Sequence, residues 1–473
     1  MKKKSFLMSI CFVLVAFFLA SCGFTTLSEM PTLDANVSSN GGQTVVKGEY
    51  LYFVDSYLDI TTLTKTDNEY GKVENCAIYR TKLVDGELEL NDEGVLDSYE
   101  LVVPKVVGTK NTNLFIYDNF IYYGSPNMQY DTAGTLRTDL IDFCKAKLDG
   151  SGVEVIYTTT NYGDSATHTF CKIEGSVYLV LFDGTDIIKV EMTTFTKSPV
   201  TLVEDVASAM LPTSTDYEYT VNYAISGMEG YVYYVRSLTD DDGFFDTSDR
   251  GNVLGRVNIK TGTKNELIDG ATTYELMDIK SGNLYIYKTI NENKTLWAKN
   301  NQNWLSGGVQ ITGTSVYTTV VVLDNVDGVN RGVIITYQDK TIWLKSADPI
   351  GNSELLLDSA ITVKYTKGDY IYYLDSTSIY RLSLTTKETE LVVSDSTMDT
   401  NYFDFGEDGY IYYFATYTGD SSESGIYLNR VNLSDKLLPE DPTDEEAETD
   451  LGYGIQLVGV LDSEHIATEE DEE

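Results

Sequence analysis

The sequence predicts an all-β protein built as a single β-propeller of four-stranded blades. Tyrosine occurs 36 times in 473 residues, and many copies fall in one recurring phrase, a turn followed by alternating apolar and aromatic residues. A second phrase, in which a basic residue stands among apolar ones, follows each copy of the first. No helical period interrupts the series, and period-two alternation with aromatic enrichment is typical of strands.

The tyrosine-rich phrase is expected to form the second strand, B, of each four-stranded unit. Its copies are GEYLYFVD (48–55), DNFIYYGS (118–125), GSVYLVLFD (175–183), EGYVYYVRS (229–237), SGNLYIYK (281–288), RGVIITYQD (331–339), GDYIYYLDS (368–376) and GYIYYFAT (409–416). The basic phrase that follows, such as SIYRLSL at 378–384, is expected to form strand C. Strand A precedes strand B, and VNYAISG at 221–227 is the expected strand A of the fourth unit. A short apolar strand D, such as TELVV at 389–393, closes each unit.

Eight units of this kind lie between residues 41 and 463, so an eight-bladed propeller is predicted. Seven blades are the alternative, because the first two units are irregular. A set of β-sandwich domains would not repeat one phrase at this interval. The acidic segment 436–451 is expected to be an insertion within the last blade, and 464–473 an acidic, disordered tail.

The segment GDYIYYLDSTSIYRLSLTTKETELVV at 368–393 resembles bacterial propeller repeats of the DUF5050 type. Those repeats are in turn similar to the propeller repeats of the low-density-lipoprotein receptor. The resemblance is clear over the last two units and fades toward the first three. It implies a propeller and a binding role, and it supplies no catalytic residues.

The N-terminus resembles a bacterial lipoprotein signal. Three lysines precede an uncharged apolar run from Leu7 to Leu19, and Ala20, Ser21 and Cys22 follow. The run is shorter than a transmembrane helix requires. We therefore expect residues 1–21 to be removed, Cys22 to carry a diacylglyceryl anchor, and 22–40 to be a flexible linker. The expected location is the extracytoplasmic face of the bacterial cell envelope; the alternative is an ordinary cleaved signal with a chance cysteine.

Composition excludes some partners. The chain carries 73 acidic and 34 basic residues, a net charge of −39, which argues against nucleic acid as a partner. Three cysteines remain in the predicted propeller, at 76, 144 and 171, without the spacing of a zinc site or a disulfide framework. Only two histidines occur, so a His-based triad is not indicated.

The loops indicate which face of the propeller binds. A–B and C–D turns share one face, and B–C and D–A connections share the other. The predicted B–C connections at 55–75, 124–140, 237–252 and 415–425 are long, as is the predicted D–A connection 204–220. Long connections in repeat proteins tend to mark the binding face, so the B–C/D–A face is predicted to be that face. The alternative is that these loops are long because nothing constrains their length.

Two of these loops contain candidate binding residues. In TDDDGFFDTSDRGN (239–252), the paired aromatics Phe244 and Phe245 with Asp246 are predicted to contact a glycan or a protein partner. In the alternative interpretation, Phe244 and Phe245 pack beneath the loop. In the second loop the candidates are Tyr130 and Arg137, residue types that interfaces enrich.

Calcium is the one cofactor for which the sequence contains candidate ligands. Asp240, Asp241 and Asp242 are a weak calcium candidate, since the acids do not alternate as in a calcium loop. A solvated acidic loop is the competing interpretation, and no other cofactor is expected.

No catalytic constellation stands out, so a membrane-anchored binding or scaffold module for protein or glycan is the main functional prediction. One alternative is a carbohydrate-active enzyme, a glycosidase or lyase with paired carboxylates in the funnel. A second alternative is a scaffold that adds a partner strand at a blade edge.

Overall fold

The computed structural model describes most of the chain from Val37 to Asn432, together with Ile455–Gln456. The residues outside the description are 1–36, 39, 59, 61–62, 64–67, 92–95, 110–113, 164–165, 193–197, 213–229, 239–250, 281–282, 301–302, 306, 312–316, 324–332, 338–340, 346–352, 359–361, 395, 406–409, 418–424, 433–454 and 457–473. The predicted signal, linker, acidic insertion and tail fall wholly or almost wholly among them.

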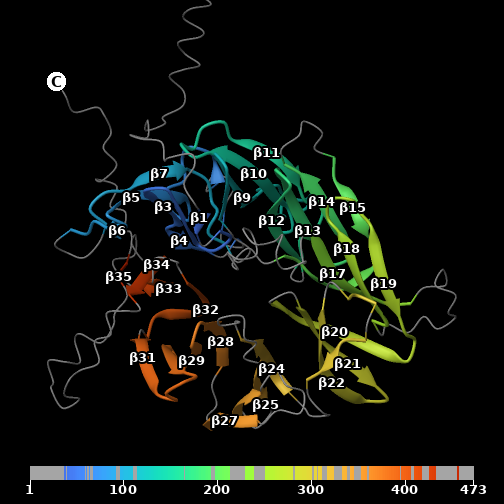
Figure 1. Ribbon diagram of the computed structural model, residues 1–473. Helices are drawn as coiled ribbons and strands as arrows, with labels where there is room; N and C mark the ends of the chain where they lie inside the picture. The colour runs from blue at the N-terminus through green and yellow to red at the C-terminus, as the bar shows by residue number, and fades with distance from the viewer. Residues whose placement is uncertain are drawn as a thin grey trace, which may run out of the picture.

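The described strands form eight antiparallel sheets that follow one another around a ring (Figure 1). The first sheet contains β1 (Val37–Ser38), β2 (Thr44–Lys47), β3 (Tyr50–Val54), β5 (Ile78–Val84), β6 (Glu87–Leu88) and β7 (Glu100–Val103). The second contains β8 (Phe115–Tyr117), β9 (Phe120–Pro126), β10 (Ile141–Lys147) and β11 (Glu154–Thr158). The third contains β12 (Thr167–Ile173), β13 (Ser176–Phe182), β14 (Ile187–Glu191) and β15 (Val200–Val203), and the fourth β16 (Val206–Met210), β17 (Tyr231–Arg236), β18 (Val253–Asn258) and β19 (Lys264–Ile268).

The second half of the ring repeats the arrangement. The fifth sheet contains β20 (Thr272–Lys280), β21 (Asn283–Ile290), β22 (Asn293–Asn300) and β23 (Val309–Gln310). The sixth contains β24 (Tyr317–Val322), β25 (Val333–Tyr337), β26 (Thr341–Lys345) and β27 (Ser353–Asp358), and the seventh β28 (Thr362–Lys367), β29 (Tyr370–Asp375), β30 (Ser378–Ser383) and β31 (Thr389–Ser394). The eighth contains β32 (Met398–Phe405), β33 (Tyr410–Tyr417), β34 (Gly425–Asn432) and β35 (Ile455–Gln456), joined by β4 (Ser56–Tyr57) from the first half of the chain.

The predicted fold class, an all-β propeller of four-stranded blades, is confirmed, and the eight described sheets correspond to the eight predicted units. The fourth blade differs from expectation. Its innermost strand is β16, which pairs with β17 directly after the third blade ends. The expected strand at 221–227 lies outside the described residues. The segment 204–220 is therefore not a D–A connection, because it contains β16 and the start of the A–B connection.

The tyrosine-rich phrase is explained by burial between blades. Successive side chains of strand B point to opposite sheet faces, so each blade contacts both neighbours. In β17, Tyr233 packs toward the fifth blade and Tyr234 toward the third, and both are fully buried. Tyr52, Tyr123, Tyr285, Tyr412 and Tyr413 are likewise among the largest fully buried side chains. These tyrosines form the core, as the strand pattern predicts.

The basic residue that recurs in strand C stacks on a tyrosine ring of strand B. The guanidinium carbon of a strand-C arginine lies over the first ring of strand B, at 3.9–4.5 Å from the ring centre, in Arg80–Tyr50, Arg256–Tyr231, Arg381–Tyr370 and Arg430–Tyr410. Each pair lies on the diagonal of the antiparallel register, within reach of long side chains. Cation–π attraction adds to the packing there. The alternation of tyrosine and arginine along the chain is thus a structural repeat.

The ring closes where the first blade meets the last. β4 pairs with the first part of β34, and β35 pairs with a later part of the same strand. The last blade therefore takes part of its outer strand from the residues that follow strand B of the first blade. The Asp55 carbonyl oxygen accepts a hydrogen bond from the Leu428 amide at 2.9 Å, directly before β4. An apolar cluster that includes Phe53, Tyr412 and Phe414 fills this junction.

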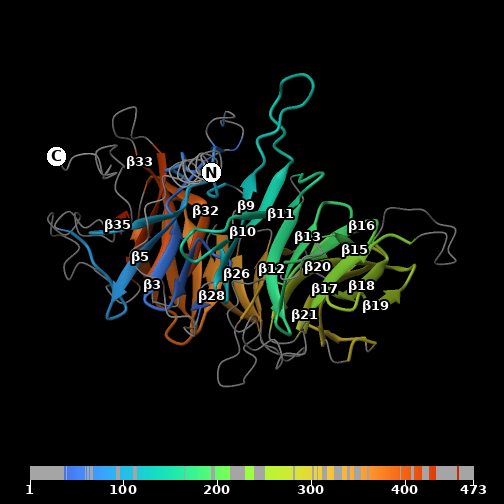
Figure 2. The same cartoon turned by 90° about the horizontal axis from the view of Figure 1, so that it is seen from above.

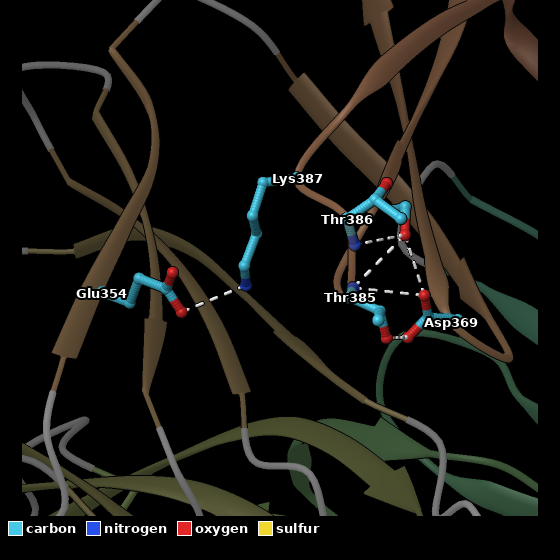
Figure 3. A network of polar contacts seen from close by, with 6 residues as sticks. Glu354, Asp369, Thr385, Thr386 and Lys387 are labelled. Carbon is cyan, nitrogen blue, oxygen red and sulfur yellow. Dashed lines mark hydrogen bonds and ion pairs between the residues drawn. The ribbon is translucent and has the colours of Figure 1, made fainter.

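Short turns on the A–B/C–D face are fixed by side-chain hydrogen bonds, as the seventh blade shows (Figure 3). Asp369, in the A–B turn, accepts from Ser383 Oγ at the end of β30 at 2.9 Å and from Thr385 Oγ1 in the C–D turn at 2.8 Å. Lys387, in the same C–D turn, donates to Glu354 of β27 at 3.1 Å. These contacts join the two turns of one blade and link them to the neighbouring blade.

Candidate functional site

The best described part of the predicted binding face lies over the first two blades. Here the B–C connection of the first blade, 55–77, contacts the end of β9 in the second blade, directly before the B–C connection 127–140. Asn68 is 6% exposed and joins the two, since its Nδ2 donates to the Pro126 carbonyl at 2.7 Å and to Ser125 Oγ at 3.2 Å. Its Oδ1 accepts from the Val106 amide at 2.8 Å. One buried amide therefore fixes three chain segments beneath the loops.

The B–C connection of the second blade is a projecting hairpin, which we call the blade-2 hairpin (127–140). In Figure 2 this segment, drawn in teal beyond β9, stands clear of the ring. The Arg137 amide donates to the Gln129 carbonyl at 2.7 Å, and Tyr130 pairs with Leu136. At the tip, Asp131 Oδ1 accepts from the amides of Ala133 and Thr135, both at 2.8 Å. Such a turn holds the tip without buried side chains.

The base of the blade-2 hairpin is held by a buried carboxylate. Asp142, in β10, is 6% exposed and accepts from Asn127 Nδ2 and Thr158 Oγ1, both at 2.7 Å. Thr159 Oγ1 accepts from the Ile141 amide at 2.9 Å. The hairpin therefore rises from an ordered base.

Both predicted residues of this loop lie in the blade-2 hairpin. Tyr130 is 41% exposed and presents an aromatic ring to solvent. Arg137 is engaged within the hairpin, because its guanidinium holds both carboxylate oxygens of Asp139, with Nε 2.6 Å from Oδ1. The hydrogen bond from Arg137 lowers the pKa of Asp139. Of the two, Tyr130 is therefore the exposed residue, and Arg137 is engaged in an ion pair within the hairpin.

The remaining predicted site residues, Cys22, Asp240, Asp241, Asp242, Phe244, Phe245 and Asp246, lie outside the described residues. Among the residues that the structure does describe, no group of three or more His, Cys, Asp or Glu side chains is placed to hold a metal ion. In the same described part, no helix is long and apolar enough to cross a membrane.

Sequence reasoning missed a buried polar cluster at the ring closure. Asp55 is 1% exposed, and its Oδ1 and Oδ2 accept from the Ala77 amide and from Ser56 Oγ, both at 2.8 Å. Ser56 Oγ also accepts from the Cys76 amide at 2.6 Å. Burial raises the pKa of Asp55 to about 7. Both oxygens are engaged in the interior, so Asp55 is not the open acid that the glycosidase hypothesis requires.

A second unexpected group is His168 in β12. It is 8% exposed and lies against Phe143, with ring centres 4.7 Å apart. Its Nδ1 is 2.9 Å from the Tyr162 hydroxyl, and its Nε2 is buried without a partner. Burial lowers the pKa of His168 to about 4, so the ring is neutral at pH 7. No sequence motif marks this position, because the histidine occupies an ordinary strand-A site.

Long connections occur on both faces of the propeller. B–C connections are short in blades five and seven, at 291–292 and 376–377. The opposite face carries long connections as well, at 85–99, 211–230 and 433–454. Loop length alone therefore does not select one face, and the blade-2 hairpin is singled out by its geometry.

No family model matches the chain, and no curated protein matches it. Solved structures with a similar arrangement include Porphyromonas gingivalis dipeptidyl peptidase 4 (11% identity, 85% of this chain and 61% of that chain, TM-score 0.45). A further example is oligopeptidase B from Leishmania major (9% identity, 85% of this chain and 54% of that chain, TM-score 0.43). Another is an oligogalacturonate lyase from Vibrio parahaemolyticus (11% identity, 85% of this chain and 99% of that chain, TM-score 0.35). The chain spans 54–61% of the length of the first three peptidases that it matches. Identities this low transfer no activity to this chain.

Proposed function

We propose that this chain is a membrane-anchored extracytoplasmic lipoprotein whose propeller is a binding or scaffold module for protein or glycan. The support for the anchor is the N-terminal sequence that ends in Cys22. The support for the binding role is the blade-2 hairpin, an ordered projection that exposes an aromatic ring. Exposed aromatics on rigid supports lose little entropy on binding, which is why they are enriched in contact surfaces.

Within this proposal Tyr130 makes the central contact, and Asp131 and the Arg137–Asp139 pair hold the hairpin in shape. Protein partners and glycans both use flat aromatic surfaces, by packing or by stacking on sugar rings. The net charge of −39 reduces non-specific association with anionic surfaces.

The binding role is tested by placing a photo-crosslinking amino acid at position 130 in living cells. Position 365 is the matched control, since Tyr365 in β28 is 39% exposed and Tyr130 is 41% exposed. We expect a discrete adduct from position 130 and none of the same mass from position 365. Equal labelling at both positions, or no adduct at 130, would reject the hairpin as the contact surface.

The anchor is tested separately with an alkyne-labelled fatty acid. We expect the intact chain to incorporate the label and Cys22→Ala to lose it and leave the membrane fraction. Label in the variant, or none in the intact chain, would contradict lipidation at Cys22.

A further inference from the structure

The blade-2 hairpin (127–140) is a convex feature of the predicted binding face. It connects β9 to β10 and stands clear of the ring (Figure 2). Sites for small molecules are concave and enclose most of the ligand surface. Projecting loops instead insert into grooves on protein partners, as long antibody loops do. The shape of the hairpin therefore favours a protein over a glycan as the partner.

The main-chain hydrogen bonds of the hairpin fix the direction of its remaining backbone groups. Two bonds join the arms: the Arg137 amide to the Gln129 carbonyl at 2.7 Å, and the Asp131 amide to the Thr135 carbonyl at 2.8 Å. They flank the antiparallel bridge between Tyr130 and Leu136, which makes these two residues a non-hydrogen-bonded pair. The amide and carbonyl of both bridge residues therefore point away from the opposite arm, toward the two edges of the ribbon.

Both edges of the ribbon are unpaired at this bridge. Within the described part of the chain, the main-chain groups of Tyr130 and Leu136 make no hydrogen bond. An unpaired N–H and C=O at a strand edge form a template for another strand, and natural proteins often block such edges with lysine or proline. Residues 127–140 contain neither lysine nor proline. The hairpin is thus open to the addition of a strand.

The first arm of the hairpin offers the more accessible edge. Residues 129–131 are all exposed, whereas Leu136 and Arg137 in the second arm are half-buried. The second arm also curls directly after the bridge, because the Leu140 amide donates back to the Arg137 carbonyl at 3.4 Å. An extended segment can therefore approach the first arm along a fully exposed stretch of chain.

The charge around the hairpin indicates the chemistry of the partner. Residues 127–140 carry two aspartates and one arginine. The connection 55–77, which contacts the end of β9, carries five acidic residues and two lysines. The whole chain has a net charge of −39. Two copies of this chain would repel each other at this surface, while a basic segment would be attracted to it.

We propose that residues 129–131 bind an extended, basic segment of a protein partner by strand addition. The amide and carbonyl of Tyr130 exchange hydrogen bonds with one residue of that segment, and the Tyr130 ring packs on a side chain of the added strand. Main-chain pairing gives affinity, while the ring and the acidic surroundings add selectivity. This inference rests on the proposed function, since it specifies the partner of the same hairpin.

The test uses the full chain and a fluorescent octapeptide of alternating threonine and lysine, with binding followed by anisotropy. The control is the same peptide N-methylated at every backbone amide, because it keeps the charge but cannot donate main-chain hydrogen bonds. We expect the N-methylated peptide to bind about tenfold more weakly or worse, since it loses a hydrogen bond and carries methyl groups at the strand edge.

Proline variants of the protein separate the two arms. Tyr130→Pro and Tyr130→Ala both remove the ring, but only proline also removes the outward amide. Tyr130→Pro should therefore weaken binding of the unmodified peptide about tenfold beyond Tyr130→Ala. Leu136→Pro is the matched control, because it removes the outward amide of the other arm, and it should bind the peptide as Leu136→Ala does. None of these changes removes a hydrogen bond between the arms.

Amide hydrogen exchange locates the contact. The Tyr130 amide should become protected when the unmodified peptide is bound, and the Leu136 amide should not. Equal affinity for the two peptides, equal affinity of Tyr130→Pro and Tyr130→Ala, or protection of the Tyr130 amide by self-association of the free chain would overturn strand addition. If position 130 still forms a protein adduct in cells, such a result rejects strand addition alone, whereas absence of any adduct rejects the proposed function. A glycan adduct at this position would also overturn strand addition.

Discussion

Replacing Asp55 with Asn should change how stability depends on pH. The folded-state pKa of Asp55 is raised by burial from 3.8 to about 7, so between these values the folded protein keeps a proton that the unfolded chain has released. Stability contributed by this group is therefore full below about pH 4 and is lost as pH rises toward 7. A difference of about 3 pH units corresponds to about 4 kcal/mol. Asn keeps the shape of the side chain and does not ionise.

The assay is the free energy of unfolding of both proteins, measured with denaturant at pH 4.5, 6 and 8. We expect Asp55→Asn to gain about 3 kcal/mol relative to the wild type between pH 4.5 and 8, most of it below pH 7. Hydrogen exchange at the Leu428 amide should report the same trend, because that amide donates to the Asp55 carbonyl across the ring closure. Ser56→Ala is the control, since it removes one hydrogen bond but keeps the carboxyl and its pH dependence. A constant difference between wild type and Asp55→Asn at all three pH values would refute the reasoning.

Three further predictions concern other buried positions. His168→Phe should remove a pH dependence of the opposite sign. The folded-state pKa of His168, about 4, lies below its ordinary value of 6.5, so wild-type stability falls by about 3 kcal/mol as pH drops through this window. Denaturant titrations at pH 7 and 4.5 should show that the variant loses less stability than the wild type. Gly108→Ala should destabilise the ring closure by about 3 kcal/mol or more, because the new Cβ would lie 1.9 Å from the Ser56 carbonyl oxygen; an unchanged melting temperature would contradict this contact. Arg80→Met should cost about 3 kcal/mol, since Arg80 is fully buried against Tyr50 and Glu100, and adding Glu100→Gln should recover part of the loss in a double-mutant cycle.

The sequence was sufficient to predict the propeller because the repeat has a direct physical cause. Strand-B residues such as Tyr233 and Tyr234 must alternate between two neighbouring blades, so period two appears in every unit. The strand-C arginine recurs because it stacks on the first strand-B ring. Features that depend on one local signal were less predictable. Strand A of the fourth blade is VASAM at 206–210. This segment is only weakly apolar, and the segment 221–227, which has the stronger strand pattern, was predicted in its place.

The candidate site could be predicted only in part. Tyr130 and Arg137 are recognisable as interface residue types, but the pairing of Arg137 with Asp139 depends on hairpin geometry. The environment of Asp55 depends on Ala77, Gly108 and Leu428, which are distant in sequence and carry no motif.

The most direct test of the binding role is a crosslinking pull-down from native membranes with three versions of the full chain. These are the intact protein, a variant in which residues 129–136 are replaced by a two-residue turn, and a variant that lacks 239–250. We expect that a partner captured by the intact protein is lost when the blade-2 hairpin is shortened, while the unfolding temperature stays unchanged. Capture of the same partner by the shortened variant, or of none by the intact chain, would contradict it.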